Sequence, residues 1–119
     1  MRPVMDSTFV FTEVVNGRLV ARLKCEKIAE RESSIISGEL ATEAGKHAWK
    51  IALDMEEVML LASVGLGSLV TLNKNCKANA GKMVVFGLGA ELFEVLKITR
   101  LDRVITIAKD RDAAIKALS

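Results

Sequence analysis

One serine stands where an apolar run meets the start of a predicted helix, in the segment Ala62-Ser63-Val64-Gly65-Leu66-Gly67. A hydroxyl at such a junction is typical of a helix N-cap, where it accepts a hydrogen bond from an amide two or three residues further on. The position also suits phosphorylation, because a phosphate adds about −1.5 to −2 charges beside free helix amides. Such a modification would spare the fold and change an apolar surface around Leu66. Ser63 is therefore the predicted site of any switch.

Two glycine pairs invite comparison with nucleotide-binding loops. Gly65-Leu66-Gly67 and Gly87-Leu88-Gly89 each match only the first two glycines of the GxGxxG pattern. Val70 and Leu92 stand where a third small residue would let helix and strand pack closely. The second pair also lacks a lysine that could reach phosphates as in a P-loop. We therefore expect neither pair to bind a nucleotide, and we expect no cofactor.

An acidic cluster follows a predicted central strand. Asp54, Glu56 and Glu57 lie where open α/β sheets place their ligands. The cluster could bind a cation, or it could be a solvated turn. His47 is the single histidine, and we interpret it as a surface or capping residue. No converging reactive groups are visible, so the sequence predicts a binding protein and not an enzyme.

The two cysteines, Cys25 and Cys76, have neither metal-site spacing nor a nearby histidine. In a reducing compartment, isolated cysteines of this kind usually pack in the core. We therefore predict no metal site and no disulfide.

The elements that must position these residues begin with a β-hairpin. Residues 8–15 are rich in Phe, Val and Thr, which suit a pleated surface. Asn16-Gly17 supplies two residues that tolerate positive φ, as a type I′ turn requires. Alternate residues of the return strand then share one face, namely Leu19, Ala21, Leu23 and Cys25.

Helices and strands alternate along the rest of the chain. Periodicity predicts helices over residues 30–46, 64–80, 90–99 and 111–118, and strands over residues 50–55, 82–88 and 104–108. Gly81 is expected to end the second helix in a left-handed conformation, and Asp110 to cap the last. Asn73 falls on an apolar helix side, where its amide should bond to the backbone. Such alternation with right-handed crossovers predicts a mainly parallel sheet flanked by helices.

Composition places limits on the function. The 119 residues fit one domain, and half of them are hydrophobic. Seventeen basic and fifteen acidic residues are interspersed, so there is no electrostatic case for nucleic acid or an anionic membrane. Tyrosine is absent, which argues against base stacking. We find no apolar run of signal-peptide or membrane-spanning length, and a cytoplasmic location is expected.

Several segments together resemble the STAS domain family, which sulphate transporters and anti-sigma factor antagonists share. The family pattern is an apolar strand ending in Asp-Leu, then Asp-Ser-Ser/Thr-Gly-Leu-Gly at a helix start. The matching segments are Lys50-Ile-Ala-Leu-Asp54, Ala62 to Leu69, and residues 80–85, 92–99, 101–104 and 112–115. The resemblance covers most of the chain from Leu19 and is weakest between Glu26 and Trp49. It implies one STAS-like domain over residues 1–119, with a hairpin followed by a mixed, mainly parallel sheet.

The same resemblance implies protein binding without catalysis. Anti-sigma factor antagonists of this family bind an anti-sigma factor, which releases the sigma factor. That anti-sigma factor is a serine kinase that phosphorylates the first serine of the motif and thereby blocks binding. A metal-dependent phosphatase restores it. Carried over to this chain, the phosphoacceptor is Ser63, and the docking surface consists of Ala62, Ser63, Val64, Gly65 and Leu66.

Three residues depart from the family pattern. Ala62 replaces the usual Asp, and Val64 replaces a second hydroxyl residue. Arg100 stands where glycine is frequent at a helix exit, which costs about 1 kcal/mol if positive φ is needed there. Without a carboxylate beside Ser63, a second interpretation is a scaffold subunit of a signalling complex that is never phosphorylated. A third is a small-ligand, nucleotide-binding or catalytic domain that uses the turn at residues 54–57.

Overall fold

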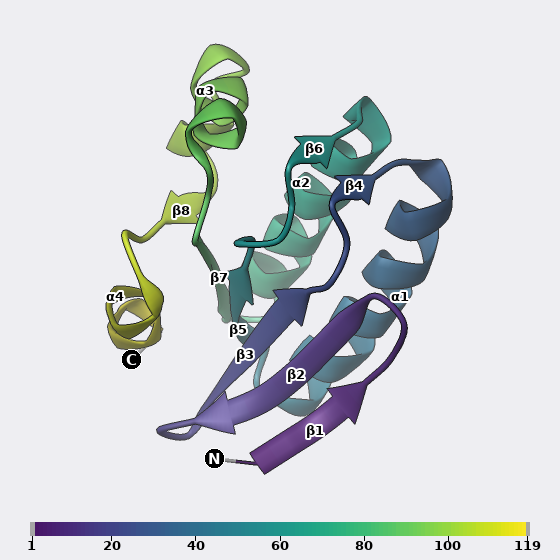
Figure 1. Ribbon diagram of the computed structural model, residues 1–119. Coiled ribbons are helices and arrows are strands. Elements are labelled where there is room, and N and C mark those ends of the chain that lie inside the picture. Colours follow the sequence, from purple (N-terminus) through teal and green to yellow (C-terminus); the bar gives the residue numbers. More distant parts are fainter. Residues whose placement is uncertain (1, 119) are drawn as a thin grey trace.

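A six-stranded mixed sheet forms the centre of the computed structural model, which describes residues 2–118 (Figure 1). Its strand order is β1-β2-β3-β5-β7-β8. The strands are β1 (Arg2–Asp6), β2 (Val10–Val15), β3 (Arg18–Leu23), β5 (Lys50–Asp54), β7 (Lys82–Phe86) and β8 (Thr106–Ile107). The first three pair antiparallel, and β3, β5, β7 and β8 run parallel. The predicted α/β fold with a mainly parallel sheet is therefore confirmed.

The predicted hairpin is the β2–β3 pair. Asn16 and Gly17 both have positive φ, at 52° and 76°, as the predicted turn requires. Its first strand starts at Val10, two residues later than expected. Sequence reasoning missed β1, which pairs with β2 at the edge of the sheet. The hairpin thus supplies the antiparallel half of the sheet, to which β5 adds in parallel.

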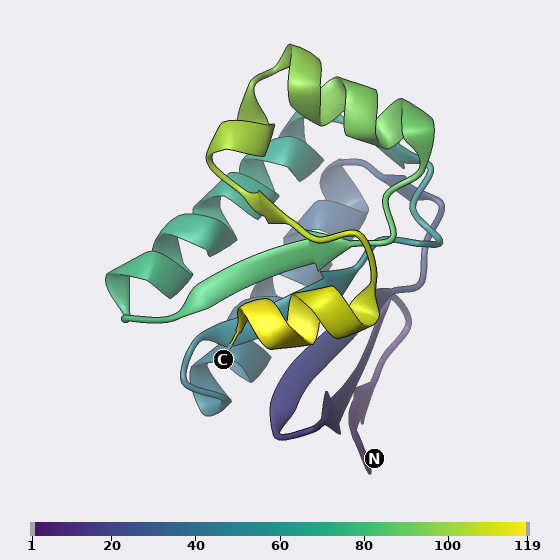
Figure 2. The ribbon, with the colours of Figure 1, turned by 90° about the vertical axis from the view of Figure 1, so that its left-hand side faces the viewer.

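Helices cover the two faces of the sheet unequally. The longer helices α1 (Glu30–Lys46) and α2 (Ser63–Ala78) lie side by side on one face, and the short helix α4 (Arg111–Ala117) lies on the other (Figures 1 and 2). Alternate residues of the central strands divide between the two cores. In β5, Ile51 and Leu53 join the larger core, and Ala52 joins the core beneath α4.

Short elements position the starts of the helices. The pair β4 (Lys27–Ile28) and β6 (Leu60–Leu61) forms a two-stranded parallel sheet that sequence reasoning missed. Each strand leads directly into a helix, β4 into α1 and β6 into α2. This pairing holds the two helix starts together. Helix α3 (Ala90–Ile98) and a 3-10 turn, η1 (Leu101–Arg103), lie at the same end of the molecule (Figure 1).

One prediction about helix ends is wrong and another is confirmed. Ala80, and not Gly81, has the left-handed conformation that follows α2, with φ of 61°. Gly81 is needed for a different reason, because a Cβ there would overlap the Trp49 carbonyl oxygen. Asp110 does cap α4, since its Oδ1 accepts a hydrogen bond of 2.9 Å from the Ala113 amide. Arg100 has φ of 61°, so the expected strain at that departure from the family pattern is present.

Asn73 ties α2 to the last part of the chain. Its buried Nδ2 donates to the Val104 carbonyl oxygen at 3.1 Å, which confirms the predicted bond to backbone. This bond fixes the segment between η1 and β8 against the core. Within residues 2–118, no helix has the length and apolarity required to cross a bilayer.

Candidate functional site

Ser63 is the first residue of α2, and it is exposed. The prediction that its hydroxyl caps the helix is wrong. The N-cap is Ala62, in an extended conformation and without a side-chain hydrogen bond. The helix starts one residue early because the Leu66 amide donates to the Ala62 carbonyl oxygen at 3.1 Å. The amides of Ser63, Val64 and Gly65 therefore precede the first bond of the helix ladder and have no side-chain cap.

The five residues of the docking surface differ in exposure. Val64 is 43% exposed, while Ala62 and Leu66 are half-buried. Gly65 is buried, so it cannot supply the direct contact that the sequence predicted. A Cβ on Gly65 would stand 3.0 Å from the Ile28 carbonyl oxygen and 3.1 Å from Ile28 Cγ2. Gly65 is therefore the residue that lets the first turn of α2 approach β4.

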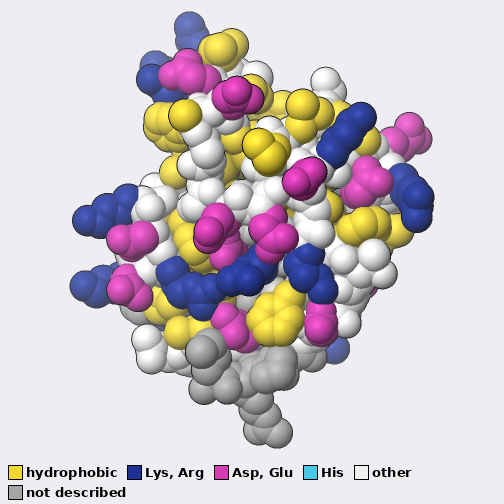
Figure 3. Space-filling view, in the orientation of Figure 1, with side chains coloured by type: hydrophobic (Ala, Val, Ile, Leu, Met, Phe, Trp, Pro, Cys, Tyr) yellow, Lys and Arg dark blue, Asp and Glu magenta, His cyan; other side chains and the backbone are white. Residues whose placement is uncertain are grey.

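Two exposed apolar residues, Met59 and Leu60, lie three and two residues before Ala62. They are 66% and 53% exposed, and both amides donate to the Glu26 carbonyl oxygen, at 2.8 and 2.9 Å. The backbone is thus fixed while the side chains face solvent. Figure 3 shows hydrophobic side chains gathered at the end of the molecule that carries α3 and β6. Within residues 58–62, Val58 alone is fully buried.

Hydroxyl groups support the first turn of α2 from behind. Ser68 Oγ donates to the Val64 carbonyl oxygen at 3.0 Å, and Ser33 Oγ of α1 donates to the same oxygen at 3.3 Å. The two hydroxyl oxygens also contact each other, so their two hydrogens are shared among these three contacts. Ser33 lies on α1 and is buried, and Ser68 lies on α2. Their contact therefore joins the two helices close to Ser63. Sequence reasoning missed it because serine spacing within one helix says nothing about the neighbouring helix.

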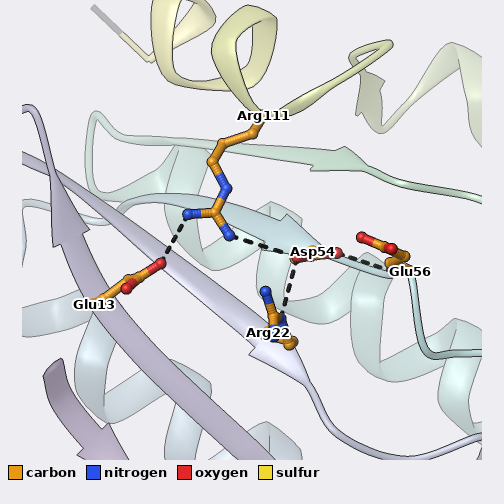
Figure 4. Close-up of polar contacts among 5 residues, drawn as sticks. All are labelled: Glu13, Arg22, Asp54, Glu56 and Arg111. Atoms are coloured by element: carbon orange, nitrogen blue, oxygen red, sulfur yellow. Dashed lines mark hydrogen bonds and ion pairs between the residues drawn. The ribbon is translucent and has the colours of Figure 1, made fainter. Parts of the chain in front are cut away.

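Asp54 is the centre of an ionic network on the face of the sheet that α4 covers (Figure 4). Asp54 is 1% exposed, and its carboxylate lies 3.4 Å from Arg22 Nε and 3.7 Å from Arg111 Nη2. Its Oδ1 accepts the Glu56 amide at 3.0 Å. Arg111 also donates to Glu13 Oε1 at 2.7 Å. Two cations and an amide therefore satisfy this buried carboxylate.

The acidic turn thus separates into two parts. Asp54 is buried and paired, so the expectation of a solvated turn holds only for Glu56 and Glu57, which are exposed. Among residues 2–118, no group of three His, Cys, Asp or Glu side chains could hold a metal ion. The geometry gives Asp54 a structural role, because its oxygens already contact protein groups.

The remaining reactive residues are dispersed. His47 is the C-cap residue of α1, in agreement with the capping interpretation, and its amide donates to the Ala44 carbonyl oxygen at 3.0 Å. Both cysteines are free, with Cys76 buried and Cys25 half-buried. Burial raises the pKa of the Cys76 thiol to about 11. Burial, followed by the charges of Glu32 and Glu57, also raises the pKa of Cys25.

Neither glycine pair forms a phosphate loop. Gly65 and Gly67 lie inside the first turns of α2, and Gly65 packs against protein atoms. Gly87 has φ of 75° and lies against the Asp54 carboxylate, where a Cβ would come within 3.1 Å of Oδ1. The tight turn at Gly87 therefore accommodates the ionic network.

A mixed sheet flanked by helices, with an exposed serine opening the helix after the second parallel strand, defines a small α/β domain of the STAS type. The family model described as "STAS domain" matches residues 12–114, and the chain belongs to that family. Among curated proteins, the anti-sigma-B factor antagonist of Listeria monocytogenes is 35% identical over 57 residues. That alignment covers 48% of this chain and 50% of the relative. The chain thus spans about half the length of the curated relatives it matches.

Solved structures share the fold across nearly the whole chain. An anti-sigma factor antagonist from Mycobacterium paratuberculosis has a TM-score of 0.81 at 17% identity, covering 96% of this chain and 98% of that one. The Bacillus cell fate determinant SpoIIAA in its phosphorylated form has a TM-score of 0.68 at 17% identity. That match covers 91% of this chain and 98% of the other. At such identities the likeness establishes the fold alone.

Proposed function

We propose that this chain is a cytoplasmic anti-sigma factor antagonist whose binding to a kinase-type anti-sigma factor is controlled at Ser63. In this proposal the partner docks on the start of α2, phosphorylates Ser63 and is released. A cognate phosphatase then restores binding. The observation that carries the proposal is the exposed hydroxyl of Ser63 at the first position of α2, beside amides that lack a side-chain cap.

The apolar surroundings of Ser63 support a protein partner. Met59, Leu60 and Val64 are the exposed apolar side chains that precede or follow it in sequence. Exposed apolar groups at one place on a surface are a frequent mark of a protein interface. Their backbone is held by the β4–β6 pair and by Ser33 and Ser68, so little ordering is needed on binding.

The electrostatics of a phosphate at Ser63 explain how one group could control this interface. Free amides at a helix start favour an anion, so the modified side chain would lie over the first turn without disturbing the helix. The phosphate would place about −1.5 to −2 charges next to Val64. An apolar partner surface would then have to bury an unpaired charge, and affinity would fall. The relatives named as anti-sigma factor antagonists, and a neighbour solved in phosphorylated form, fit this scheme.

Binding to the kinase-type anti-sigma factor of the same organism tests the switch. Ser63→Asp should weaken binding about tenfold or more, because it places a charge in the interface. Ser63→Ala should bind within about twofold of the unmodified protein, since the hydroxyl makes no hydrogen bond that the interface needs. Ser34 is also exposed, on α1, so Ser34→Asp is the matched control for added charge. Equal affinity of all four proteins would reject the proposal.

Phosphorylation itself needs a separate assay. The chain is incubated with the anti-sigma factor and ATP, and intact mass is measured. We expect one added phosphate in the unmodified protein and none in Ser63→Ala. Peptide mapping then assigns the site. Modification at a residue outside the docking surface would contradict the assignment of Ser63.

One observation favours a second candidate, a scaffold subunit that binds without being phosphorylated. Ala62 provides no carboxylate next to Ser63, where the family pattern has Asp. If the kinase needs that group, the chain would bind its partner constitutively. The two candidates differ in a single measurement, because the scaffold binds the anti-sigma factor or another complex subunit yet gains no phosphate with ATP.

A further inference from the structure

A cavity of about 100 Å³ lies between α1 and α2. These two helices lie side by side on one face of the sheet (Figure 1). Its apolar lining is drawn from the buried core, namely Leu23, Ile28, Ile36, Leu40, Leu69 and Leu72. Hydroxyl and amide groups complete the lining, from Ser33, Ser37, Ser68, Thr71 and Asn75. A mostly apolar hollow with a few polar groups on one side is the usual composition of a small-molecule site.

The apolar part of this cavity is unfavourable for a buried water molecule. A buried water requires two to four polar partners, and the leucine and isoleucine side chains offer none. Comparable apolar cavities of about 150 Å³ stay dry and take up benzene. The present cavity is smaller and partly open, so it suits a body the size of a single ring or a short branched alkyl group.

The hydroxyl pair at the cavity specifies the polar end of such a ligand. The Ser33 and Ser68 hydroxyls lie within hydrogen-bond distance of the Val64 carbonyl oxygen and of each other. Each hydroxyl has one hydrogen and two acceptor positions, so their donors are already used within the protein. Acceptor positions remain. The hydroxyl pair therefore favours a ligand that donates a hydrogen bond.

We propose that this cavity binds a small, uncharged amphiphile, with an apolar body of about six carbons and one hydroxyl that donates to the Ser68 hydroxyl. Phenol is the simplest molecule of this class. Among the residues that the structure describes, no charged side chain lines the cavity, which argues against an ionic ligand. Binding of this ligand requires only the cavity and its hydroxyls and does not depend on the proposed function.

Occupancy would also act on the first turn of α2. Gly65 lines the cavity, and the Val64 carbonyl oxygen accepts a hydrogen bond from the same Ser68 hydroxyl that the ligand would engage. Those two residues directly follow Ser63. A bound ligand would therefore stiffen the turn on which the docking surface is built, which is a consequence of the site and not part of the evidence for it.

Methyl and amide NMR of the full chain, titrated with phenol, tests the site. We expect saturable shifts that centre on Ile36, Leu69 and Leu72, with a Kd in the millimolar range. Benzene has the same ring without the donor and should bind about threefold or more weakly, in keeping with one lost hydrogen bond. Absence of saturable shifts, or shifts centred elsewhere, would overturn the proposal.

Two variants separate the roles of shape and hydroxyl. Ala41→Leu fills the cavity from α1 and should abolish binding of both probes, while Ala78→Leu, at an exposed position of α2, should leave it unchanged. Ser68→Ala should lower phenol affinity to that of benzene. If Ala41→Leu does not fold, Ser68→Ala still decides the matter. A Ser68→Ala protein that keeps the preference for phenol over benzene would refute the hydrogen-bonded pose.

Discussion

Arg111, the first residue of α4, donates to Glu13 of β2 at 2.7 Å across a sequence separation of 98 residues. The same guanidinium lies 3.7 Å from the buried carboxylate of Asp54 at the end of β5. One side chain therefore joins the last helix to the first hairpin and to the central strand. Because α4 has only seven residues, its position depends on this contact as well as on its small apolar core.

Removing the charge of Asp54 should destabilise the fold. Asp54→Asn leaves Arg22 and Arg111 without their shared anion, and we expect the free energy of unfolding to fall by about 2 kcal/mol. This is less than for a fully buried pair, because both arginines are partly exposed and regain water. Urea denaturation measures the change.

A double-mutant cycle with Arg111→Met isolates the pair. The two substitutions should be non-additive by about 0.5–1 kcal/mol or more, since each removes the same interaction. Lys109→Met is the matched control, because Lys109 is an exposed cation in the preceding loop. Strict additivity of Asp54→Asn and Arg111→Met would show that the network contributes no coupling.

The uncapped start of α2 predicts a stabilising substitution. Ala62→Asp supplies an acceptor for the free amides and a negative charge at the helix N-terminus, so unfolding should cost about 1 kcal/mol more. Ala62→Asn separates the capping effect from the charge. Ala78→Asp makes the same change in the last turn, where it should be neutral or destabilising. Chemical denaturation that gives the two aspartates equal stability would contradict the N-cap assignment.

The same variant bears on regulation. If the missing carboxylate limits phosphorylation, Ala62→Asp should speed transfer of phosphate to Ser63 in the kinase assay. An unchanged rate, in a variant that is more stable, would show that the kinase does not use this carboxylate.

Two glycines should respond to alanine in opposite directions. Gly38 lies in the middle of α1, and a Cβ there meets nothing within 4 Å. Gly38→Ala should therefore raise stability by about 0.5–1 kcal/mol through lower entropy of the unfolded chain. Gly81→Ala would overlap Trp49 backbone and should lower stability by at least about 1 kcal/mol. Thermal melts compare them, and a stabilising Gly81→Ala would refute the contact.

The raised pKa of Cys76 predicts that the protein loses stability at high pH. The folded pKa of Cys76 is about 11, against 9.0 for an ordinary thiol, so the native state keeps its proton longer than the unfolded state. This stabilising contribution is complete below about pH 9 and is lost as the pH rises towards 11. Unfolding measured across that window should show the decline, and Cys76→Ala should flatten it.

Alkylation offers a second readout of the same shift. At about pH 8.5 iodoacetamide should modify half-buried Cys25 before buried Cys76, because the thiolate is the reactive form and must be reachable. Peptide mapping gives the order. Modification of Cys76 first, in the native protein, would contradict its burial.

Local patterns were sufficient for the main elements and for the exposed serine. Two positive-φ residues mark the β2–β3 turn, and apolar periodicity marks α1 and α2 to within two residues at each end. The motif around Ser63 places it correctly at a helix start. The misplaced N-cap is a one-residue error, because propensity favours serine as the cap and the backbone bond from Leu66 to Ala62 decides otherwise.

Contacts between distant segments could not be predicted from those patterns. β4 and β6 have two residues each and no alternation to detect. The Arg111–Asp54 contact and the Ser33–Ser68 bond join side chains on different elements, so no spacing along the chain encodes them. The reason for glycine at position 81 was predicted wrongly, as a left-handed conformation. The actual reason, close contact with Trp49, is visible only in three dimensions.

The two margins of the main sheet differ in a way that bears on self-association. On one side β8 has two residues, too short for a foreign strand to align along it. On the other, the register of β1 shifts between Pro3 and Met5, and a proline has no amide hydrogen to offer an incoming strand. Both edges of the sheet thus disfavour the addition of a further strand, which is the step that turns open sheets into fibrils. The protein can therefore expose apolar side chains at one end without promoting aggregation through its sheet edges.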